Sequence, residues 1–152
     1  MTDHIYILSG PVQSGKTTRL LQWIENRNDV SGILTPVING KRFFMDISTR
    51  ETFSMEADEG EADILAVGKY LFSKKSFDKA KHILLQSAGK PAGWLVIDEI
   101  GPLELKGEGF YDVIRYILDR AEGQLKIIFV MRESILQEVL AHFHITGHSL
   151  FE

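Results

Sequence analysis

The sequence predicts an α/β fold, in which helices cover both faces of a mainly parallel β-sheet to give three layers. Short runs of apolar residues alternate along the chain with segments whose apolar residues recur at helical spacing. These runs have no polar face, which is typical of strands buried inside a parallel sheet. One further segment has the pattern of an antiparallel hairpin, which we expect as an insertion in this sheet.

The first strand and the first helix are expected close to the N-terminus. Residues 5–8 are continuously apolar and too few for a helix. Residues 9–16 are rich in glycine and turn formers, and after Thr17 the apolar residues at 20, 21 and 24 recur at helical spacing. The chain therefore passes from strand through loop to helix.

The antiparallel insertion is expected between about residues 32 and 55. Asn39-Gly40 is favoured in two-residue hairpin turns because both positions tolerate positive φ. The strands beside this turn are predicted at residues 33–38 and 43–47, and residues 52–55 suit a third short strand.

The second half of the chain returns to alternating helices and strands. After an acidic stretch at 56–63, which we expect to be exposed, a helix is predicted over 76–87 with Ser76 as N-cap and Gly89 as its stop. The remaining predictions are strands at 94–97 and 125–130 and helices at 110–118 and 135–140. Without a repeat or a linker, the sequence predicts one domain over residues 1–152.

Composition excludes several classes of function. The 152 residues carry a net charge of -4, so a nucleic-acid-binding domain, which is usually basic, is not expected. The absence of cysteine excludes disulfides and thiolate metal sites. No apolar run approaches the roughly 18 residues of a membrane span, and the N-terminus lacks a signal-peptide pattern, so we expect a cytoplasmic protein. We interpret His142, His144 and His148 as incidental surface residues.

The strongest motif is the glycine-rich loop between the first strand and the first helix. It matches G-x-x-x-x-G-K-[ST], the P-loop pattern, at every position. Loop amides and the helix N-terminus would bind the phosphates of a nucleoside triphosphate, Lys16 would reach the β- and γ-phosphates, and the Thr17 hydroxyl would bind Mg²⁺. The predicted phosphate-binding residues are Gly10, Pro11, Val12, Gln13, Ser14, Gly15, Lys16, Thr17 and Thr18.

A second motif follows the strand predicted at 94–97. An apolar strand ending in a carboxylate is the Walker B pattern, in which Asp98 would hold Mg²⁺. Ligands of open α/β sheets bind at the carboxyl edge of the strands, so Asp98 and the P-loop can converge. Glu99 is expected on the opposite face of the strand end, where it could orient a water molecule and accept its proton.

Around these carboxylates the sequence resembles a known family. The run Val96-Ile97-Asp98-Glu99-Ile100-Gly101-Pro102-Leu103-Glu104-Leu105 is similar to the Asp-Glu-Ile-Gly-x-x-Glu-Leu signature of the small P-loop nucleoside-triphosphatases. That family has archaeal, bacterial and animal members and includes the human cancer-related nucleoside-triphosphatase. Weaker similarity extends over nearly the whole chain, through the segments at 32–35, 42–44 and 67–70.

The resemblance implies a RecA-like P-loop fold and Mg²⁺-dependent hydrolysis of nucleoside triphosphates with broad base tolerance. It assigns the phosphates to residues 10–17, the metal to Asp98 and the attacking water to Glu99. Met131-Arg132 stands where a His-Arg pair commonly ends the later strand, which leaves Arg132 as the candidate γ-phosphate sensor.

Two other functions stay open at this stage. A small-molecule kinase would use the same P-loop, but residues 56–90 contain no arginine for the usual lid. A non-catalytic nucleotide-binding adaptor would need only the binding residues, because fold does not fix function. We interpret Lys69, Lys74, Lys75, Lys79 and Lys81 as a solvated helix face rather than a lid over phosphates. A hydrolase of this kind could also require an activating protein, which the sequence does not identify.

Overall fold

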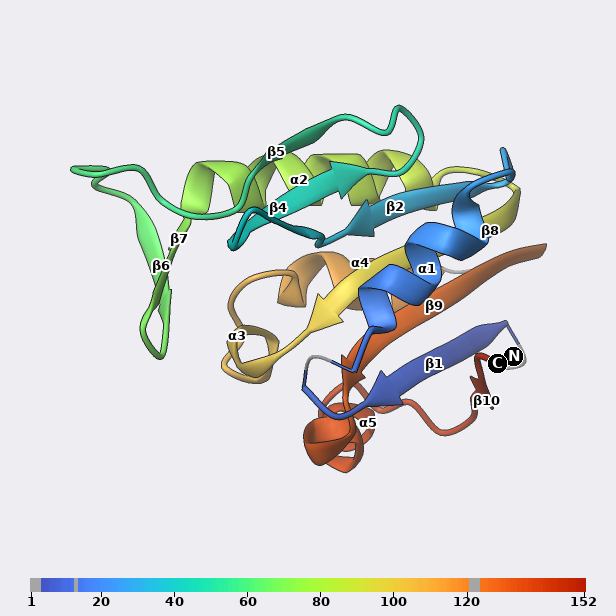
Figure 1. The fold of residues 1–152 in the computed structure, drawn as a ribbon. Helices are drawn as coiled ribbons and strands as arrows, with labels where there is room; N and C mark the ends of the chain where they lie inside the picture. Colours follow the sequence, from blue (N-terminus) through green and yellow to red (C-terminus); the bar gives the residue numbers. More distant parts are fainter. Residues whose placement is uncertain (1–3, 13, 121–123) are drawn as a thin grey trace.

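The computed structural model describes residues 4–12, 14–120 and 124–152, and it confirms the α/β fold with a mainly parallel central sheet (Figure 1). Five strands pair in parallel through the middle of this sheet. Their spatial order is β10 (Ser149–Leu150), β1 (Ile5–Gly10), β9 (Gln124–Arg132), β8 (Ala92–Ile100) and β2 (Val30–Leu34). The strand that leads into the P-loop is thus separated by β9 from the strand that carries Asp98.

The antiparallel insertion is present, but its first predicted strand is divided. In place of one strand over 33–38 there are two, β2 and the short β3 (Val37–Ile38), because Pro36 interrupts them. The hairpin turns at Asn39 and Gly40, with φ of 52° and 78°, into β4 (Lys41–Asp46). The third predicted strand is also present as β5 (Thr52–Ser54), which pairs with β4.

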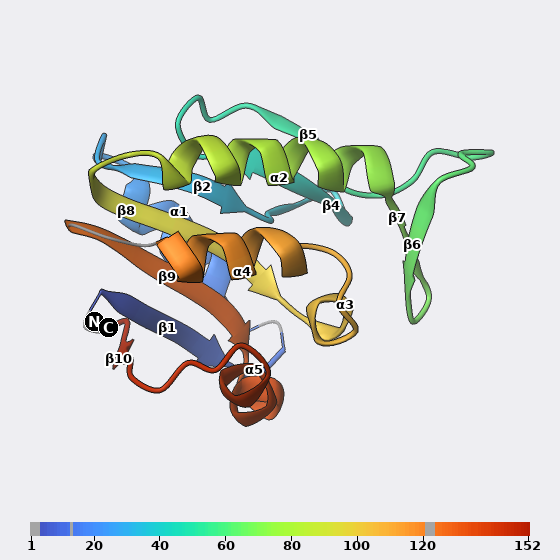
Figure 2. The same ribbon diagram turned by 180° about the vertical axis from the view of Figure 1, so that it is seen from behind.

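Helices cover both faces of the sheet, which gives the three predicted layers. One face carries α1 (Lys16–Ile24), and the other carries α2 (Lys74–Ala88) and α4 (Tyr111–Arg120), as the two opposite views show (Figures 1 and 2). Each face has its own apolar core: Leu20 and Ile24 of α1 are fully buried on the first, and Leu84 and Ile114 of α2 and α4 on the second. No helix among the described residues is long and apolar enough to cross a membrane.

Helix α2 begins earlier than the sequence suggested. Ser73, not Ser76, is its N-cap, and the Ser73 hydroxyl accepts a hydrogen bond from the Ser76 amide at 3.2 Å. Both serines are acceptable caps by type, and the chain direction before the helix, which the sequence does not reveal, decides between them. Lys74 and Asp78 then form an exposed ion pair of 3.7 Å on the outer face of the helix.

Several short elements were not predicted. A two-stranded hairpin, β6 (Ile64–Val67) and β7 (Tyr70–Ser73), extends from the body of the molecule just before α2 (Figures 1 and 2). A one-turn helix, α3 (Pro102–Leu105), follows β8. The last predicted helix is present as a 3₁₀ turn, η1 (Glu133–Ile135), followed by α5 (Leu136–His142), and the chain then adds β10 beside β1.

Candidate active site

The sequence-predicted site residues lie at the carboxyl ends of the central strands. The P-loop follows β1, Arg132 ends β9, and the two carboxylates Asp98 and Glu99 lie near the end of β8. The register pairs Gly10 with Arg132 and Asp98 with Val130, so these strand ends share one edge of the sheet. This edge is where ligands of open α/β sheets bind.

The P-loop depends on two glycines. Gly15 has φ of 84°, a left-handed conformation, and it is the N-cap from which α1 starts at Lys16. A Cβ atom on Gly10 would lie 2.8 Å from the Ser14 hydroxyl oxygen, so a side chain there would displace that hydroxyl. Among the described residues no side chain caps α1, which leaves its first amide groups without a side-chain acceptor. Gln13 lies outside the described residues.

Lys16 and Thr17 place a cation and a hydroxyl inside the loop. The Lys16 ammonium donates to the Pro11 carbonyl oxygen at 2.8 Å and to the Gly10 carbonyl oxygen at 3.4 Å. The Thr17 hydroxyl donates to Oδ2 of Asp98 at 2.7 Å, across 81 positions of sequence. The P-loop and the end of β8 are therefore in direct contact.

Asp98 is a buried carboxylate near the end of β8. Its exposed fraction is 1%, and its Oδ2 also accepts a hydrogen bond from the Thr35 amide at 3.0 Å. Among the described residues, no Lys, Arg or His nitrogen lies within 4.0 Å of it. Burial raises the pKa of Asp98, while the hydrogen bonds from Thr17 and Thr35 lower it. A hydroxyl and a buried carboxylate side by side are suitable ligands for a hard divalent cation such as Mg²⁺.

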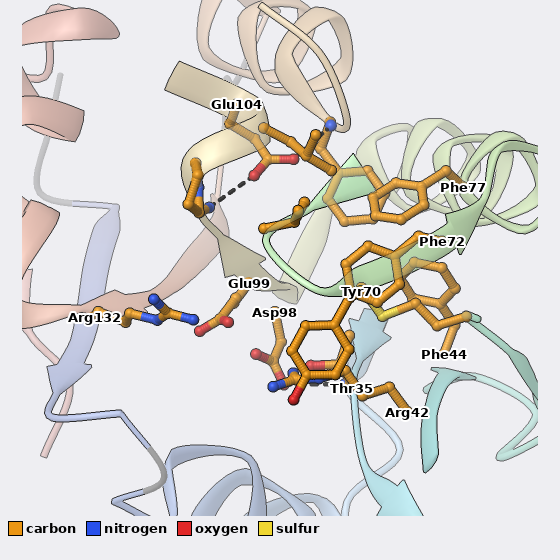
Figure 3. Close-up of a pocket in the computed structure, with 16 residues that line it drawn as sticks. Thr35, Arg42, Phe44, Tyr70, Phe72, Phe77, Asp98, Glu99, Glu104 and Arg132 are labelled. Atoms are coloured by element: carbon orange, nitrogen blue, oxygen red, sulfur yellow. Dashed lines mark hydrogen bonds between the residues drawn. The ribbon is translucent and has the colours of Figure 1, made fainter. Parts of the chain in front are cut away.

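Glu99 lies on the same side of the site as Asp98, and the prediction that it points to the opposite face is wrong. Strict alternation along β8 would separate the two side chains, but the ladder to β9 shifts register between Asp98 and Ile100. In Figure 3 the two carboxylates face a common space. Burial, and then the charge of Asp98, raise the pKa of Glu99, whereas Arg132, Lys16 and Arg42 lower it.

Two pockets meet at these carboxylates. The first, the P-loop pocket, has a volume of about 400 Å³, within the size range of small-molecule sites. It is lined by Val12, Ser14, Gly15, Lys16, Thr17, Thr18, Leu21, Thr35, Pro36, Val37, Arg42, Asp98, Glu99 and Arg132. The second, the aromatic pocket, has a volume of about 70 Å³ and is lined mainly by Phe44, Met55, Val67, Tyr70, Phe72, Phe77, Leu103 and Phe110. Five residues line both pockets: Thr35, Arg42, Asp98, Glu99 and Arg132.

Two arginines flank Glu99 from different elements. Arg132 extends from the end of β9, and Arg42 reaches the site from β4 (Figure 3). Neither has a carboxylate partner within 4.0 Å among the described residues. The Arg42 guanidinium lies 5.2 Å from the centre of the Tyr70 ring, which supports it through a cation–π contact. Both positive charges are free to bind an anion between the pockets.

Glu104 fixes the loop that closes the aromatic pocket. Its Oε1 accepts a hydrogen bond from the Gly101 amide at 2.7 Å, and its Oε2 accepts one from the Phe110 amide at 2.8 Å. Burial raises the pKa of Glu104 to about 7, although these two hydrogen bonds act in the opposite direction. The side chain is 2% exposed, so it holds both ends of residues 101–110 from the inside.

Most of the sequence-predicted residues meet in the P-loop pocket, but not all of them. Gly10 and Pro11 do not line it, although their carbonyl groups hold Lys16. The five lysines between 69 and 81 also lie outside its lining. Arg42 and Thr35 also line the pocket, but neither was among the predicted site residues. Thr35 follows β2, and recognising β2 as a member of the parallel sheet would have placed it at this edge. No comparable feature of the sequence places Arg42 at this edge.

The sheet order, the strand–P-loop–helix unit and the contact between Thr17 and Asp98 define a P-loop protein of the nucleoside-triphosphatase type. Comparison with known proteins identifies the family. The model of the NTPase family matches residues 5–151, and the chain belongs to this family.

Individual relatives agree with this assignment. The chain is 33% identical over 130 residues to the nucleoside-triphosphatase THEP1 of Saccharolobus solfataricus, covering 80% of this chain and 73% of that protein. Its fold is similar to the crystal structure of THEP1 from Aquifex aeolicus, with a TM-score of 0.72 at 20% identity, covering 97% and 88% of the two chains. The solution structure of a human cancer-related nucleoside triphosphatase is also similar, with a TM-score of 0.65 at 21% identity, covering 99% and 88%.

Proposed function

We propose that this protein hydrolyses nucleoside 5′-triphosphates to diphosphate and phosphate in a reaction that depends on Mg²⁺. The observation that carries the proposal is the hydrogen bond of 2.7 Å between Thr17 and Asp98, with Glu99 beside it in the same pocket. Membership of the NTPase family supports the reaction class. The residues of the P-loop pocket then supply separate tasks.

Binding of the triphosphate is the task of the P-loop. The loop amides and the N-terminus of α1 offer hydrogen bonds and a partial positive charge to phosphate oxygens. Lys16 adds a full positive charge, which reaches the terminal phosphates once it exchanges the carbonyl groups of Gly10 and Pro11 for them. Val12 and Val37 are 54% and 61% exposed on the pocket wall and offer the base apolar contact without hydrogen-bond selection.

Thr17 and Asp98 are the residues that would hold Mg²⁺. The hydroxyl and carboxylate already touch, and Asp98 lacks a cation of its own among the described residues. The ion would supply positive charge against the negative charge that develops on the phosphate oxygens.

Glu99 is the proposed general base. A water in front of the γ-phosphate would donate a hydrogen bond to its carboxylate, which accepts the proton as the water attacks. The raised pKa of Glu99 makes it a better proton acceptor than an ordinary exposed carboxylate. Arg132 and Arg42, on either side, would stabilise the charge on the γ-phosphate oxygens.

Substituting the two carboxylates separately tests these roles. Asp98→Ala should weaken binding of the Mg²⁺–nucleotide complex because a charged metal ligand is lost. Glu99→Gln keeps the size and a hydrogen-bonding group but removes the base, so it should bind normally and lose about 10²–10⁴-fold in turnover. Affinity for a non-hydrolysable triphosphate and phosphate release from ATP, GTP, CTP and UTP, without added acceptor, are measured for both variants.

Lys16→Ala serves as the binding control. A triphosphate at one hundred times its dissociation constant should stabilise the parent by about 2.7 kcal/mol, and this variant should lose most of that effect. If the Glu99→Gln variant releases phosphate as fast as the parent, Glu99 is not the general base. Tight binding without phosphate release in the parent would favour a nucleotide-binding adaptor instead.

A further inference from the structure

The β6–β7 hairpin has no task in the hydrolysis proposed above, although it is built onto the strand that carries Arg42. The Ser73 amide at the end of β7 donates to the Met55 carbonyl oxygen at 2.9 Å. Beside this bond, Glu56 forms an antiparallel bridge with Phe72. Met55 in turn donates its own amide to the Arg42 carbonyl oxygen at 3.1 Å. The hairpin and Arg42 therefore belong to one connected set of backbone hydrogen bonds.

Arg42 is held by this set without losing its charge. Its backbone amide donates to Oε2 of Glu56 at 2.8 Å, so the nearest acidic side chain binds the backbone. Its guanidinium lies 5.2 Å from the centre of the Tyr70 ring. Within the described part of the chain, no carboxylate oxygen lies within 4.0 Å of this guanidinium. The side chain is thus fixed in place while its N–H groups stay available to phosphate oxygens.

Tyr70 is a firm support because the core holds it in turn. Tyr70 and Phe72 lie on the same face of β7, where their rings stack with centres 5.7 Å apart and planes 5° apart. Phe72 is 5% exposed, and its ring centre lies 6.0 Å from that of Phe77 on α2. Leu71, between the two, points outward and is 53% exposed. A line of three rings therefore runs from the core to Arg42.

Such a support matters for an arginine at this position. Arg42 follows the Asn39-Gly40 turn at the start of β4, on an insertion at the side of the parallel sheet. A free arginine side chain samples many rotamers, and ordering it costs conformational entropy. A charge that is already in place when the reaction begins stabilises the transition state without further rearrangement. An aromatic face attracts the guanidinium without neutralising it, which a carboxylate would do.

We propose that Tyr70 is a positioning residue for the hydrolysis, whose ring holds the Arg42 guanidinium where negative charge develops on the γ-phosphate. The inference rests on the triphosphate site proposed above. Figure 3 shows the Tyr70 ring beside Arg42, at the side of the space that Asp98 faces. Lys69 also lies over this ring, at 5.6 Å, but it lines neither pocket, so the role belongs to the contact with Arg42.

Two substitutions of Tyr70 separate the ring from its hydroxyl. Tyr70→Leu removes the ring and keeps an apolar side chain, so kcat should fall by about 2–30-fold, the rate equivalent of one cation–π contact. Affinity for a non-hydrolysable triphosphate should change less. Tyr70→Phe keeps the ring and should retain the parental kcat. The matched control is Tyr111→Leu, because Tyr111 is also half-buried but lines neither pocket, and kcat should not change.

A double substitution distinguishes positioning from a merely structural role. If the ring acts through Arg42, then Tyr70→Leu should cause no further loss of kcat in the Arg42→Ala protein. Three results would overturn the proposal: a parental kcat in Tyr70→Leu, a Tyr70→Phe protein as slow as Tyr70→Leu, or an equal loss from Tyr70→Leu with and without Arg42.

A binding measurement keeps this test independent of turnover. The complex of ADP, Mg²⁺ and aluminium fluoride imitates the phosphoryl group in transfer, and transition-state analogues report the interactions that stabilise that state. Tyr70→Leu should bind it about 2–30-fold more weakly than the parent, and the Arg42→Ala background should abolish this difference. If the parent binds the complex but releases no phosphate from ATP, the hydrolase proposal fails and these affinities still decide the role of Tyr70. A parent that does not bind the complex would contradict both proposals.

Discussion

The P-loop pocket and the aromatic pocket share five residues but are built in opposite ways. The P-loop pocket consists largely of exposed or half-buried polar groups on a loop and a helix start, and only Asp98 and Thr35 of its polar groups are buried. The aromatic pocket is lined by core residues, with Phe44, Phe77 and Phe110 exposed by 0%, 3% and 1%. The first can change its contacts on binding, whereas the second is fixed by packing.

The difference predicts where function and stability can be separated. Removing a half-buried cation from the P-loop pocket takes away an interaction with phosphate but few packing contacts. Removing a ring from the aromatic pocket leaves a cavity in the core. Substitutions in the two pockets should therefore fail in different assays.

The largest effect on activity is expected from Arg132→Ala. A well-placed arginine contributes about 10³–10⁵ in phosphoryl-transfer rate, and we expect a loss near the lower end because Arg42 remains on the other side of Glu99. The midpoint of denaturant unfolding should change little. Phosphate release and unfolding are measured together, with Arg120→Ala as control, since Arg120 is exposed on α4 and lines neither pocket. If Arg132→Ala turns over as fast as the parent protein, Arg132 is not the γ-phosphate sensor.

Phe44→Ala should produce the opposite pattern. Phe44 is fully buried and contacts the rings of Phe53, Phe77 and Phe110, so its truncation should cost about 3–5 kcal/mol in the free energy of unfolding. Triphosphate binding by the protein that stays folded should persist, because none of the described P-loop residues lines the aromatic pocket. A cost under about 1 kcal/mol would mean that the pocket collapses to fill the gap.

The sequence was sufficient where a local pattern carries the information. The P-loop, the Asn39-Gly40 turn and the layer order follow from glycine positions and periodicity, and each is present. The N-cap of α2 was wrong by one helical turn, because Ser73 and Ser76 are chemically equivalent candidates.

The aromatic pocket could not have been predicted in the same way. Its rings come from β4, β7, α2 and the loop after α3, and only the folded chain brings them together. Arg42 has the same difficulty, since it lies on an insertion with no motif of its own. The direction of the Glu99 side chain was predicted wrongly because the alternation of side chains along β8 is interrupted where the register shifts between Asp98 and Ile100.

The smallest effect is expected from Glu104, which lines the aromatic pocket and not the P-loop pocket. Burial raises its pKa from 4.5 to about 7 in the folded protein, so between these values the folded state keeps a proton that the unfolded chain has released. Stability from this group is therefore fully present below about pH 4.5 and is lost as pH rises through about 7, by about 3 kcal/mol at most.

Glu104→Gln should remove this part of the pH dependence. It should also cost about 1–3 kcal/mol at every pH, since its amide group cannot accept from both Gly101 and Phe110. Unfolding is measured from pH 5 to 8 for the parent, Glu104→Gln and the exposed control Glu108→Gln. A slope in Glu104→Gln equal to that of the parent would show that the two amide hydrogen bonds keep the carboxylate ionised despite burial.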